Sequence, residues 1–478
     1  MKFAHIKKHS LIILFLLFYL SINVYKLTTS PTPFYDWDES IYIQAGKEMI
    51  ENKSLVPSWN GNPWLEKPPL VPFLYGFFTV YSNNPEISTR LFSLFLSIIA
   101  LVLIYLWVMK LSKSKIIALT TVIITAFNPI FLQRTQVVNT DSLLLIGWLG
   151  YLLYFPRFYL SFFFLFLGVF SKSLLGFYPA ILYLIFEAYS FVFKNKTIKK
   201  QVVINIKKII LQILILSIWF FVMFAIYKQQ FIQIHFSDHL FRRITSSIES
   251  HFGKRTFYFD VILKEYSYSI IFLLLGGFLI IKKYLAKKIN DNNIFLSIAF
   301  IPFFLFLNLT KTKISWYLYP TIHQFAFLIA YPLILLKKLK VLQYLFCLII
   351  IGFVIYQSIF INSYFKNFYS QYDETYRITL LAKNKCSSLI ILPSENERET
   401  HDTLKSMNLL ISTSEQYGNK PSIFYYFEKP VLFIYSPEDI VSTKGSCLLL
   451  NKNDIDFIKK LEFEEIKQEN DLLLLKMH

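Results

Sequence analysis

Two neighbouring carboxylates in the first polar stretch of the chain have the chemistry of a general base. Asp38 and Glu39 stand at the start of residues 39–52, whose apolar side chains recur on one side of a predicted amphipathic helix. An acid at this position also caps a helix and favours its positive end. The alternative interpretation is that one carboxylate accepts a proton from a substrate. The spacing alone leaves both interpretations open.

A charged pair, Glu66-Lys67, lies later in the same polar stretch. Asn60-Gly61 before the pair predicts a turn. Pro68 or Pro69 after it suits the first turn of a second helix, which we predict to reach residue 81. Apolar residues flank the pair on both sides, so it is either a structural ion pair or a site for an anion.

Three more charged residues stand at the ends of apolar runs. Asp141 is either a helix cap or a site residue, because an ionisable group at the end of a membrane span is a functional candidate. Lys172 either binds a substrate or extends to the membrane interface. Lys313 lies close to Trp316, and both residue types are common anchors at a membrane interface.

The segment 228–267 is rich in arginine, lysine and histidine. One hypothesis is a phosphate-binding cluster, because arginine offers two parallel hydrogen bonds to phosphate oxygens. A second is a metal site built from histidine and carboxylate, and a third is a solvated basic loop. The residues concerned are His235, Asp238, His239, Arg242, Arg243, His251, Lys254 and Arg255.

The composition identifies the class of protein that must position these residues. Of 478 residues, 55% are hydrophobic and only 17% are charged, whereas soluble proteins are typically about 25% charged. This excludes a soluble enzyme and a disordered scaffold. The apolar residues form long runs and do not alternate, which excludes a porin-like barrel. The fold class is therefore a polytopic α-helical membrane protein.

Eleven membrane spans are predicted from the apolar runs. Basic residues gather in every second connecting segment, which places those segments and the N-terminus in the cytoplasm. The C-terminus and the loops 28–89 and 228–267 are then extracytoplasmic, on the same face as every candidate residue. No cleavage site follows the first span, so we interpret it as a signal anchor. The spans are 11–26, 90–110, 116–133, 141–155, 158–171, 174–194, 208–227, 268–283, 293–309, 315–335 and 341–360.

The net charge of +18 is distributed unevenly along the chain. Residues 361–478 hold 14 Lys+Arg and 17 Asp+Glu, which gives a net charge of −3. The remaining residues, 1–360, hold 35 Lys+Arg and 14 Asp+Glu, which gives a net charge of +21. The basic residues lie in short segments between apolar runs. Membrane orientation therefore explains them, and nucleic acid is not an expected partner.

The division of charge and hydropathy predicts two domains: a membrane domain over 1–360 and an external domain over 361–478. The second is long enough for a small α/β domain. Residues 388–392 and 431–435 have the pattern of strands, whereas 456–469 favour a helix. Cys386 and Cys447 both fall in this external domain and could form a disulfide, and their spacing is not that of a zinc site.

These residues, in this order, resemble the GT-C glycosyltransferases of the protein O-mannosyltransferase and lipid A aminoarabinose transferase (ArnT-like) group. The resemblance covers roughly residues 11–335. The matching features are Asp38-Glu39 after the first span, Leu65-Glu66-Lys67-Pro68-Pro69-Leu70, Arg134 through Asp141, Phe170 through Gly176, and Thr312-Lys313-Ile314-Ser315-Trp316-Tyr317-Leu318-Tyr319-Pro320. The sequence departs from the family after Lys172, where Ser-Leu-Leu-Gly replaces the usual Gly-Pro.

The resemblance implies a GT-C fold and a sugar donor carried on a polyprenyl phosphate. It implies that Asp38 is the catalytic carboxylate and that Glu39 helps to place the acceptor. Asp141 matches a second acidic position of the family. Lys67 and Arg242 are the implied ligands of the lipid phosphate, and we add Lys172 and Lys313 to that set of cations. The leaving group is an alkyl phosphate, so these cations would stabilise its developing charge.

The implied reaction requires no cofactor, because the donor is a monophosphate ester. Some relatives place a metal near Glu66 and a histidine of the second loop, and His239 could serve here, so a divalent metal stays open.

The predicted function is inverting sugar transfer at the outer face of the plasma membrane. The partners are the lipid-linked donor, membrane lipids, and an acceptor that is a lipid, a protein or a glycan. A transporter or flippase of lipid-linked sugars is the alternative, and it predicts charges deep within the spans. A membrane-anchored scaffold is a second alternative, which leaves Asp38 and Lys67 without a role.

Overall fold

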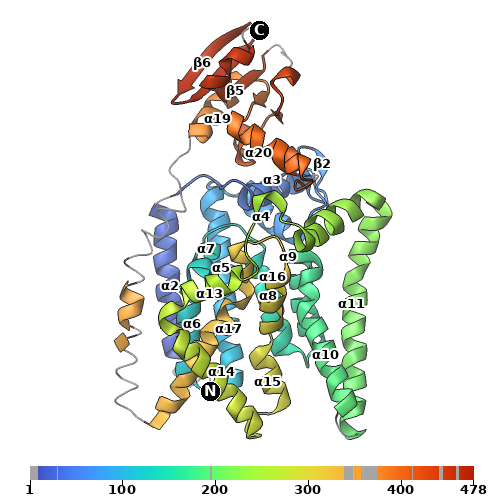
Figure 1. The fold of residues 1–478 in the computed structure, drawn as a ribbon, viewed down its shortest axis with the longest axis vertical. Helices are drawn as coiled ribbons and strands as arrows, with labels where there is room; N and C mark the ends of the chain where they lie inside the picture. Colours follow the sequence, from blue (N-terminus) through green and yellow to red (C-terminus); the bar gives the residue numbers. More distant parts are fainter. Residues whose placement is uncertain are drawn as a thin grey trace.

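The polypeptide forms a helical bundle with a smaller domain on one end (Figure 1). The computed structural model describes residues 9–29, 31–193, 196–338, 348–349, 351–356, 359, 374–411, 413–440, 445–458 and 462–478. The first helix, α2 (Ser10–Thr29), begins at the end of the bundle far from the C-terminal domain (Figure 1). The predicted domain boundary at residue 360 lies outside the described residues.

Apolar helices pack around the long helix α5 (Pro85–Ser112), in which Trp107 is fully buried. Such helices satisfy their own backbone hydrogen bonds, as spanning segments must. The remaining helices of the bundle are α6 (Lys115–Ala126), α7 (Pro129–Thr135), α8 (Asp141–Tyr154), α9 (Phe158–Lys172), α10 (Tyr178–Phe193), α11 (Lys196–Phe231), α12 (Arg242–Thr245), α13 (Phe257–Glu265), α14 (Ile270–Leu285), α15 (Asp291–Ile298), α16 (Ile301–Leu309) and α17 (Ile322–Ala330).

Fewer membrane spans are identified among the described residues than the sequence predicts for the whole chain. Among the described residues, six helical stretches are long and apolar enough to cross a membrane, or eight if each of two bent pairs counts as one span. The count of eleven is not confirmed. The predicted span 116–133 divides into α6 and α7, which meet at 72° because Pro129 begins a new helix. Helix α8 has 14 residues, fewer than the roughly 20 that a span needs, and 341–360 lies largely outside the described residues.

Both helices predicted in the first polar segment are present. They are α3 (Asp38–Glu51) and α4 (Leu70–Tyr81), and they lie at the end of the bundle that faces the C-terminal domain (Figure 1). The predicted turn at Asn60-Gly61 joins two short antiparallel strands, β1 (Ser58–Trp59) and β2 (Asn62–Pro63). The two helices therefore hold the loop that contains Glu66-Lys67 between them.

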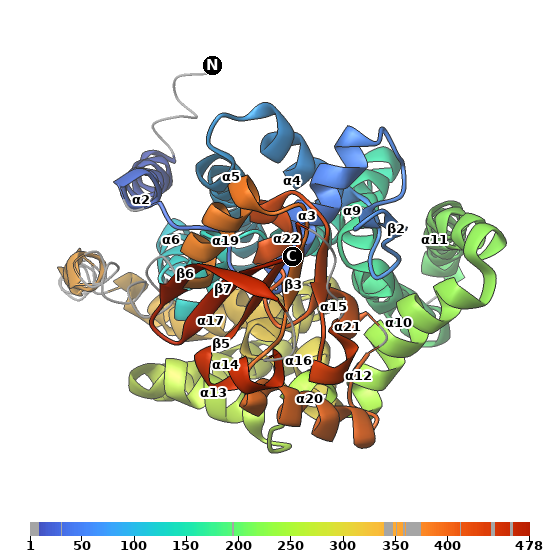
Figure 2. The same cartoon turned by 90° about the horizontal axis from the view of Figure 1, so that it is seen from above.

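The C-terminal domain is built on a mixed five-stranded sheet in the order β4-β3-β5-β7-β6. The α/β prediction for this domain is confirmed, and the two predicted strands correspond to β3 and β4, which run parallel. Viewed from above, the sheet lies over α3 and the centre of the bundle (Figure 2). The elements are β3 (Leu389–Ile391), β4 (Val431–Phe433), β5 (Cys447–Asn451), β6 (Phe463–Glu469), β7 (Leu472–Met477), α19 (Glu374–Lys385), α20 (Glu395–Ser406), α21 (Ser414–Tyr417) and α22 (Ser422–Phe427).

The helix predicted over 456–469 is wrong. Phe463–Glu469 forms the edge strand β6, which pairs antiparallel with β7. The charged residues of this edge strand have high helix propensity when the segment is considered alone. In the folded domain they form a strand because the apolar strand β7 provides a hydrogen-bonded neighbour. The disulfide that remained open in the sequence is formed between Cys386 and Cys447, and it ties the end of α19 to β5.

Glycine allows α3 and α4 to cross closely, which yields a test of the fold. A Cβ atom at Gly46 would lie 2.2 Å from the Pro72 carbonyl oxygen, so Gly46→Ala forces the two helices apart. We expect the variant to lose about 1–3 kcal/mol of stability from overpacking, measured by thermal unfolding in detergent. Gly277→Ala in α14 is the control, since no atom lies within 4 Å of its Cβ position. Equal melting temperatures for the two variants would contradict the close crossing.

Candidate active site

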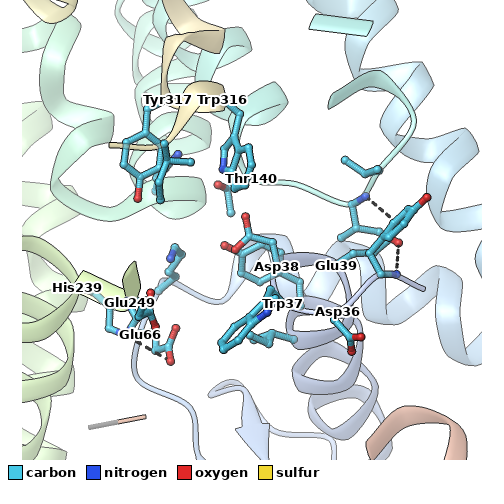
Figure 3. Close-up of a pocket in the computed structure, with 18 of the residues that line it drawn as sticks. Asp36, Trp37, Asp38, Glu39, Glu66, Thr140, His239, Glu249, Trp316 and Tyr317 are labelled. Atoms are coloured by element: carbon cyan, nitrogen blue, oxygen red, sulfur yellow. Dashed lines mark hydrogen bonds and ion pairs between the residues drawn. The ribbon is translucent and has the colours of Figure 1, made fainter. Parts of the chain in front are cut away.

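A cavity of about 470 Å³ lies where α3, the α7–α8 connection and the C-terminal domain meet. Figure 3 shows Trp316 and Tyr317 on one side of this cavity, Glu66 and His239 on another, and Asp38 between them. Basic and acidic side chains face the cavity together with aromatic rings. We refer to this space as the polar chamber. Its described lining includes Trp37, Asp38, Glu66, Lys67, Arg134, Lys172, His239, Arg243, Glu249, His251, Trp316, Tyr317, Ile411 and Tyr417.

Asp38 is the accessible carboxylate at the centre of the polar chamber. It is the first residue of α3, its side chain is 44% exposed, and Nη2 of Arg134 lies 3.4 Å from its Oδ2. The preceding residue, Trp37, has φ 67° and ψ −127°. A positive φ is uncommon for a bulky residue, and such strained conformations concentrate at functional sites. The sharp turn at Trp37 starts α3 with Asp38 facing the chamber.

Asp141 is fully buried and holds two cations at the edge of the chamber. Its Oδ2 accepts a hydrogen bond from Nη2 of Arg134 at 2.9 Å, and its Oδ1 bonds Lys172. A buried carboxylate must be paired because leaving water is costly for an ion. Asp141 therefore fixes Arg134 and Lys172, which line the chamber and stack on the rings of Trp316 and Tyr317.

Glu39 forms a buried ion pair and is fully bonded. Arg90 donates to both carboxylate oxygens of Glu39, at 3.1 and 2.7 Å. The backbone amides of Tyr35 and Val138 donate to the same carboxylate at 2.8 and 3.1 Å. These four bonds join the turn before α3 to α5 and to the α7–α8 connection, so the geometry gives Glu39 an architectural role.

Lys67 lines the chamber without a direct ion-pair partner among the described residues. No ion pair or hydrogen bond links its ammonium to any side chain in the part of the chain that the structure describes, and its closest aromatic neighbour is Tyr42, with the ring centroid at 5.9 Å. Burial lowers the pKa of Lys67, although the carboxylates of Glu66 and Asp38 act in the opposite direction. A partly buried ammonium without a partner is a site for an anion.

Glu66 and His239 come together as predicted, and their side chains are in direct contact. His239 Nε2 lies 3.3 Å from Oε1 of Glu66. Burial by itself raises the pKa of the Glu66 carboxyl, and the imidazole of His239 together with Lys67 lowers it to about 2. Catalytic zinc sites use three protein ligands, and no group of three histidine, cysteine or carboxylate side chains exists among the described residues. The Glu66–His239 pair therefore lacks the third protein ligand of a catalytic zinc site.

A second, apolar cavity of about 140 Å³ adjoins the polar chamber. Leucine and phenylalanine side chains of the bundle contribute to its walls, including Leu144, Leu240, Phe303, Phe306 and Leu307. The side chains that line both cavities are Glu66, Lys67, Lys172, His239, Arg243 and Tyr317. The two spaces therefore meet at a ring of charged and polar groups.

Two of the predicted phosphate ligands lie outside both cavities. Arg242 turns to Asp238, at 3.3 Å, and to Asn408 of the C-terminal domain. Its neighbour Arg243 faces both cavities, because consecutive helical residues point about 100° apart. Lys313 donates to the carbonyl oxygens of Leu307 and Asn308 at the end of α16, where a cation complements the helix C-terminus.

Arg134, Arg243 and Tyr417 line the chamber, although none of them was assigned a role from the sequence beyond the place of Arg243 in the basic segment 228–267. Arg134 begins the motif that runs to Asp141. A basic residue shortly before this acidic residue was the only local sign that the two could pair. Predicting that Arg243 faces the cavities would require knowing the rotational phase of the short helix α12, which the sequence does not define. Tyr417 comes from α21 of the C-terminal domain, and no local pattern in the sequence links it to the chamber.

The buried pair Arg90–Glu39 gives a stability test. Arg90→Leu leaves the Glu39 carboxylate buried without its cation, and breaking a buried pair in this way costs about 3–5 kcal/mol. Lys47→Leu breaks the half-exposed Lys47–Glu428 pair, 3.4 Å in length, and should cost less than about 1 kcal/mol. Thermal unfolding of both variants measures the difference. A melting temperature of Arg90→Leu no lower than that of Lys47→Leu would refute the architectural role.

The chain resembles known proteins in sequence. A family model described as dolichyl-phosphate-mannose-protein mannosyltransferase matches residues 66–219. An uncharacterized protein of Aquifex aeolicus is 24% identical over 330 residues, which are 65% of this chain and 62% of that protein. This chain thus matches less than two thirds of the length of that relative.

Solved structures share the fold over nearly the whole chain. ArnT from Cupriavidus metallidurans bound to undecaprenyl phosphate superposes with a TM-score of 0.63 at 12% identity, covering 98% of both chains. The apo state of the same protein gives a TM-score of 0.62 at 11% identity, with the same coverage. The resemblance to the GT-C glycosyltransferases of the protein O-mannosyltransferase and ArnT-like superfamily is therefore confirmed, by a family model within the first half of the chain and by a common fold.

Proposed function

We propose that this protein is an integral-membrane glycosyltransferase that moves one sugar from a polyprenyl-phosphate-linked donor to an extracytoplasmic acceptor. The observation that carries the proposal is the unpaired ammonium of Lys67, which stands where the polar chamber meets the apolar cavity. A ligand that occupies both spaces has an anionic head and an apolar tail. A lipid phosphate has this chemistry, and the structurally similar ArnT was solved with undecaprenyl phosphate.

The cations around Lys67 support binding of the phosphate. Arg243 and Lys172 line both cavities beside Lys67. Arg243 is partly neutralised by Glu249, with Nη2 and Oε2 2.9 Å apart, and Lys172 by Asp141. The ammonium of Lys67 has no ion-pair partner among the described residues, so it is available to the ligand. In the reaction the bond between the anomeric carbon and the phosphate oxygen breaks, and these cations stabilise the charge that develops on the leaving phosphate.

Asp38 is the proposed general base. Its carboxylate is exposed to the chamber, whereas Glu39 and Asp141 are buried and bonded to cations. Asp38 accepts the proton of the acceptor hydroxyl while that oxygen forms a bond to the anomeric carbon. Direct attack opposite the phosphate inverts the configuration at that carbon. The other carboxylates of the described lining each have a bonding partner. Glu39 pairs with Arg90, Glu249 pairs with Arg243, Glu66 accepts from Tyr417, and Asp36 accepts from the Ser422 amide.

The first functional test measures sugar release from the donor. Purified protein receives a panel of labelled polyprenyl-phosphate sugars, with a crude membrane extract as the source of acceptor. We expect Asp38→Asn to lower the rate of release by about 10²–10⁴-fold, since a positioned base contributes this much, while donor binding persists.

The matched control for this experiment is Asp36→Asn. The Asp36 carboxylate accepts from the Ser422 backbone amide at 2.9 Å and points away from Asp38 (Figure 3), and an amide oxygen preserves that bond. Wild-type rates in Asp38→Asn would disprove the role of the base. Donor binding without release by the wild-type protein would favour a transporter of lipid-linked sugars.

Binding of undecaprenyl phosphate tests Lys67. Lys67→Met removes a charged hydrogen bond, worth about 1.5–3 kcal/mol, so the Kd should rise by about 10–150-fold. In the wild-type protein the affinity should decline as the pH rises through the pKa of Lys67, which lies below its ordinary value. Lys67→Arg should not show this decline, because a guanidinium stays protonated. Unchanged affinity in Lys67→Met would disprove the phosphate site, and exposed Lys254→Met is the control.

A further inference from the structure

The C-terminal domain supplies part of the wall of the polar chamber. The segment 408–417 connects the end of α20 to α21 and contacts charged side chains of the bundle. Position 412 of this segment lies outside the described residues. Ile411 and Tyr417 of this segment line the chamber directly. Both side chains are 2% exposed, so they are enclosed between the two domains.

One group of contacts fixes the segment to the first polar loop. The Tyr417 hydroxyl donates a hydrogen bond to Oε1 of Glu66 and accepts one from Nε1 of Trp64 at 2.6 Å. Trp59 packs edge-on against the Tyr417 ring, with centroids 4.8 Å apart, and its Nε1 donates to the Gln416 carbonyl oxygen at 3.3 Å. Glu66 thus meets a hydroxyl on one side and His239 on the other.

A second group of contacts fixes the same segment to the basic region after α11. Ser414 donates to Oε1 of Glu249 at 2.9 Å, and the Glu249 amide donates to the Leu409 carbonyl oxygen at 3.1 Å. Arg242 donates to Asn408. Glu249 is also the partner of Arg243. The segment therefore contacts the residues that adjoin Lys67 and the residues that orient Arg243.

The hydroxyl of Tyr417 is suited to a permanent donor role. Burial and the adjacent Glu66 carboxylate raise the pKa of Tyr417 well above its ordinary value, so the hydroxyl keeps its proton. Glu66 remains ionised at neutral pH because its own pKa is lowered to about 2. A neutral donor facing a buried carboxylate satisfies that carboxylate without neutralising it. The bond fixes the Glu66 side chain, from which Lys67 follows directly in the chain.

We infer that Tyr417 is a positioning residue of the C-terminal domain: its hydroxyl holds Glu66 and thereby sets Lys67 at the junction of the two cavities. The inference rests on the proposed function, because Lys67 is the proposed ligand of the lipid phosphate. It gives the C-terminal domain a part in donor binding that the fold alone does not assign. Without the hydroxyl, Glu66 is free to turn towards the Lys67 ammonium and compete with the phosphate for it.

The test measures the Kd of undecaprenyl phosphate for the full-length protein in detergent. Tyr417→Phe preserves the ring and removes the hydroxyl, and we expect an increase in Kd of about tenfold, which corresponds to one hydrogen bond to a charged group. Tyr425→Phe is the matched control, because Tyr425 is a buried tyrosine of the same domain that packs on Phe34 and does not line the chamber. Its Kd should equal that of the wild-type protein.

A double-mutant cycle separates positioning from general loss of structure. If Tyr417 acts through Glu66, then Tyr417→Phe should weaken binding much less in a Glu66→Gln protein than in the wild type. Additive effects, or a wild-type Kd for Tyr417→Phe, would overturn the inference while the proposed function stands. A wild-type protein that does not bind undecaprenyl phosphate would overturn the proposed function and the inference with it.

Discussion

The candidate site depends on the burial of a single carboxylate, Asp141, at the end of the bundle. A fully buried carboxylate is stable only with cations around it, and Arg134 and Lys172 supply them from α7 and α9. Meeting this requirement brings three helices together at one end of the molecule. The same requirement orients two cations towards a cavity, so the electrostatic constraint that stabilises the bundle also forms the chamber.

Burial also separates the roles of the three carboxylates near the start of α3 and α8. Glu39 and Asp141 have their charges compensated by arginine or lysine and have little freedom to accept a proton from a ligand. Asp38 has one arginine contact, at 3.4 Å, and a side chain that is 44% exposed. Two adjacent residues of one helix thus have different chemistry, because the helix turns consecutive side chains about 100° apart, one to the interior and one to the chamber.

The sequence predicted what local periodicity and residue type determine. Helices α3 and α4, the Asn60-Gly61 turn and the strands β3 and β4 follow from short-range patterns. Arg242 was assigned to the phosphate from the resemblance, whereas Arg243 lines the cavities in the structure. Which of the two faces the cavities depends on the phase of a short helix after a π-helical stretch. Tyr417 could not be predicted, since Glu66 lies far away in the sequence. The edge strand β6 could be predicted only together with its partner β7, because its own residues do not have the pattern of a strand.

The arrangement of the two cavities limits what kind of substrate fits. The side chains that line both of them are charged or titratable, and the walls beyond are polar on one side and apolar on the other. A soluble sugar nucleotide would leave the apolar cavity without a ligand, and a neutral lipid would leave Lys67 without a counter-charge, at the cost of a buried unpaired ion. An amphipathic phosphate satisfies both. The proposal of a lipid-linked donor therefore rests on the junction at Lys67, and not on either cavity by itself.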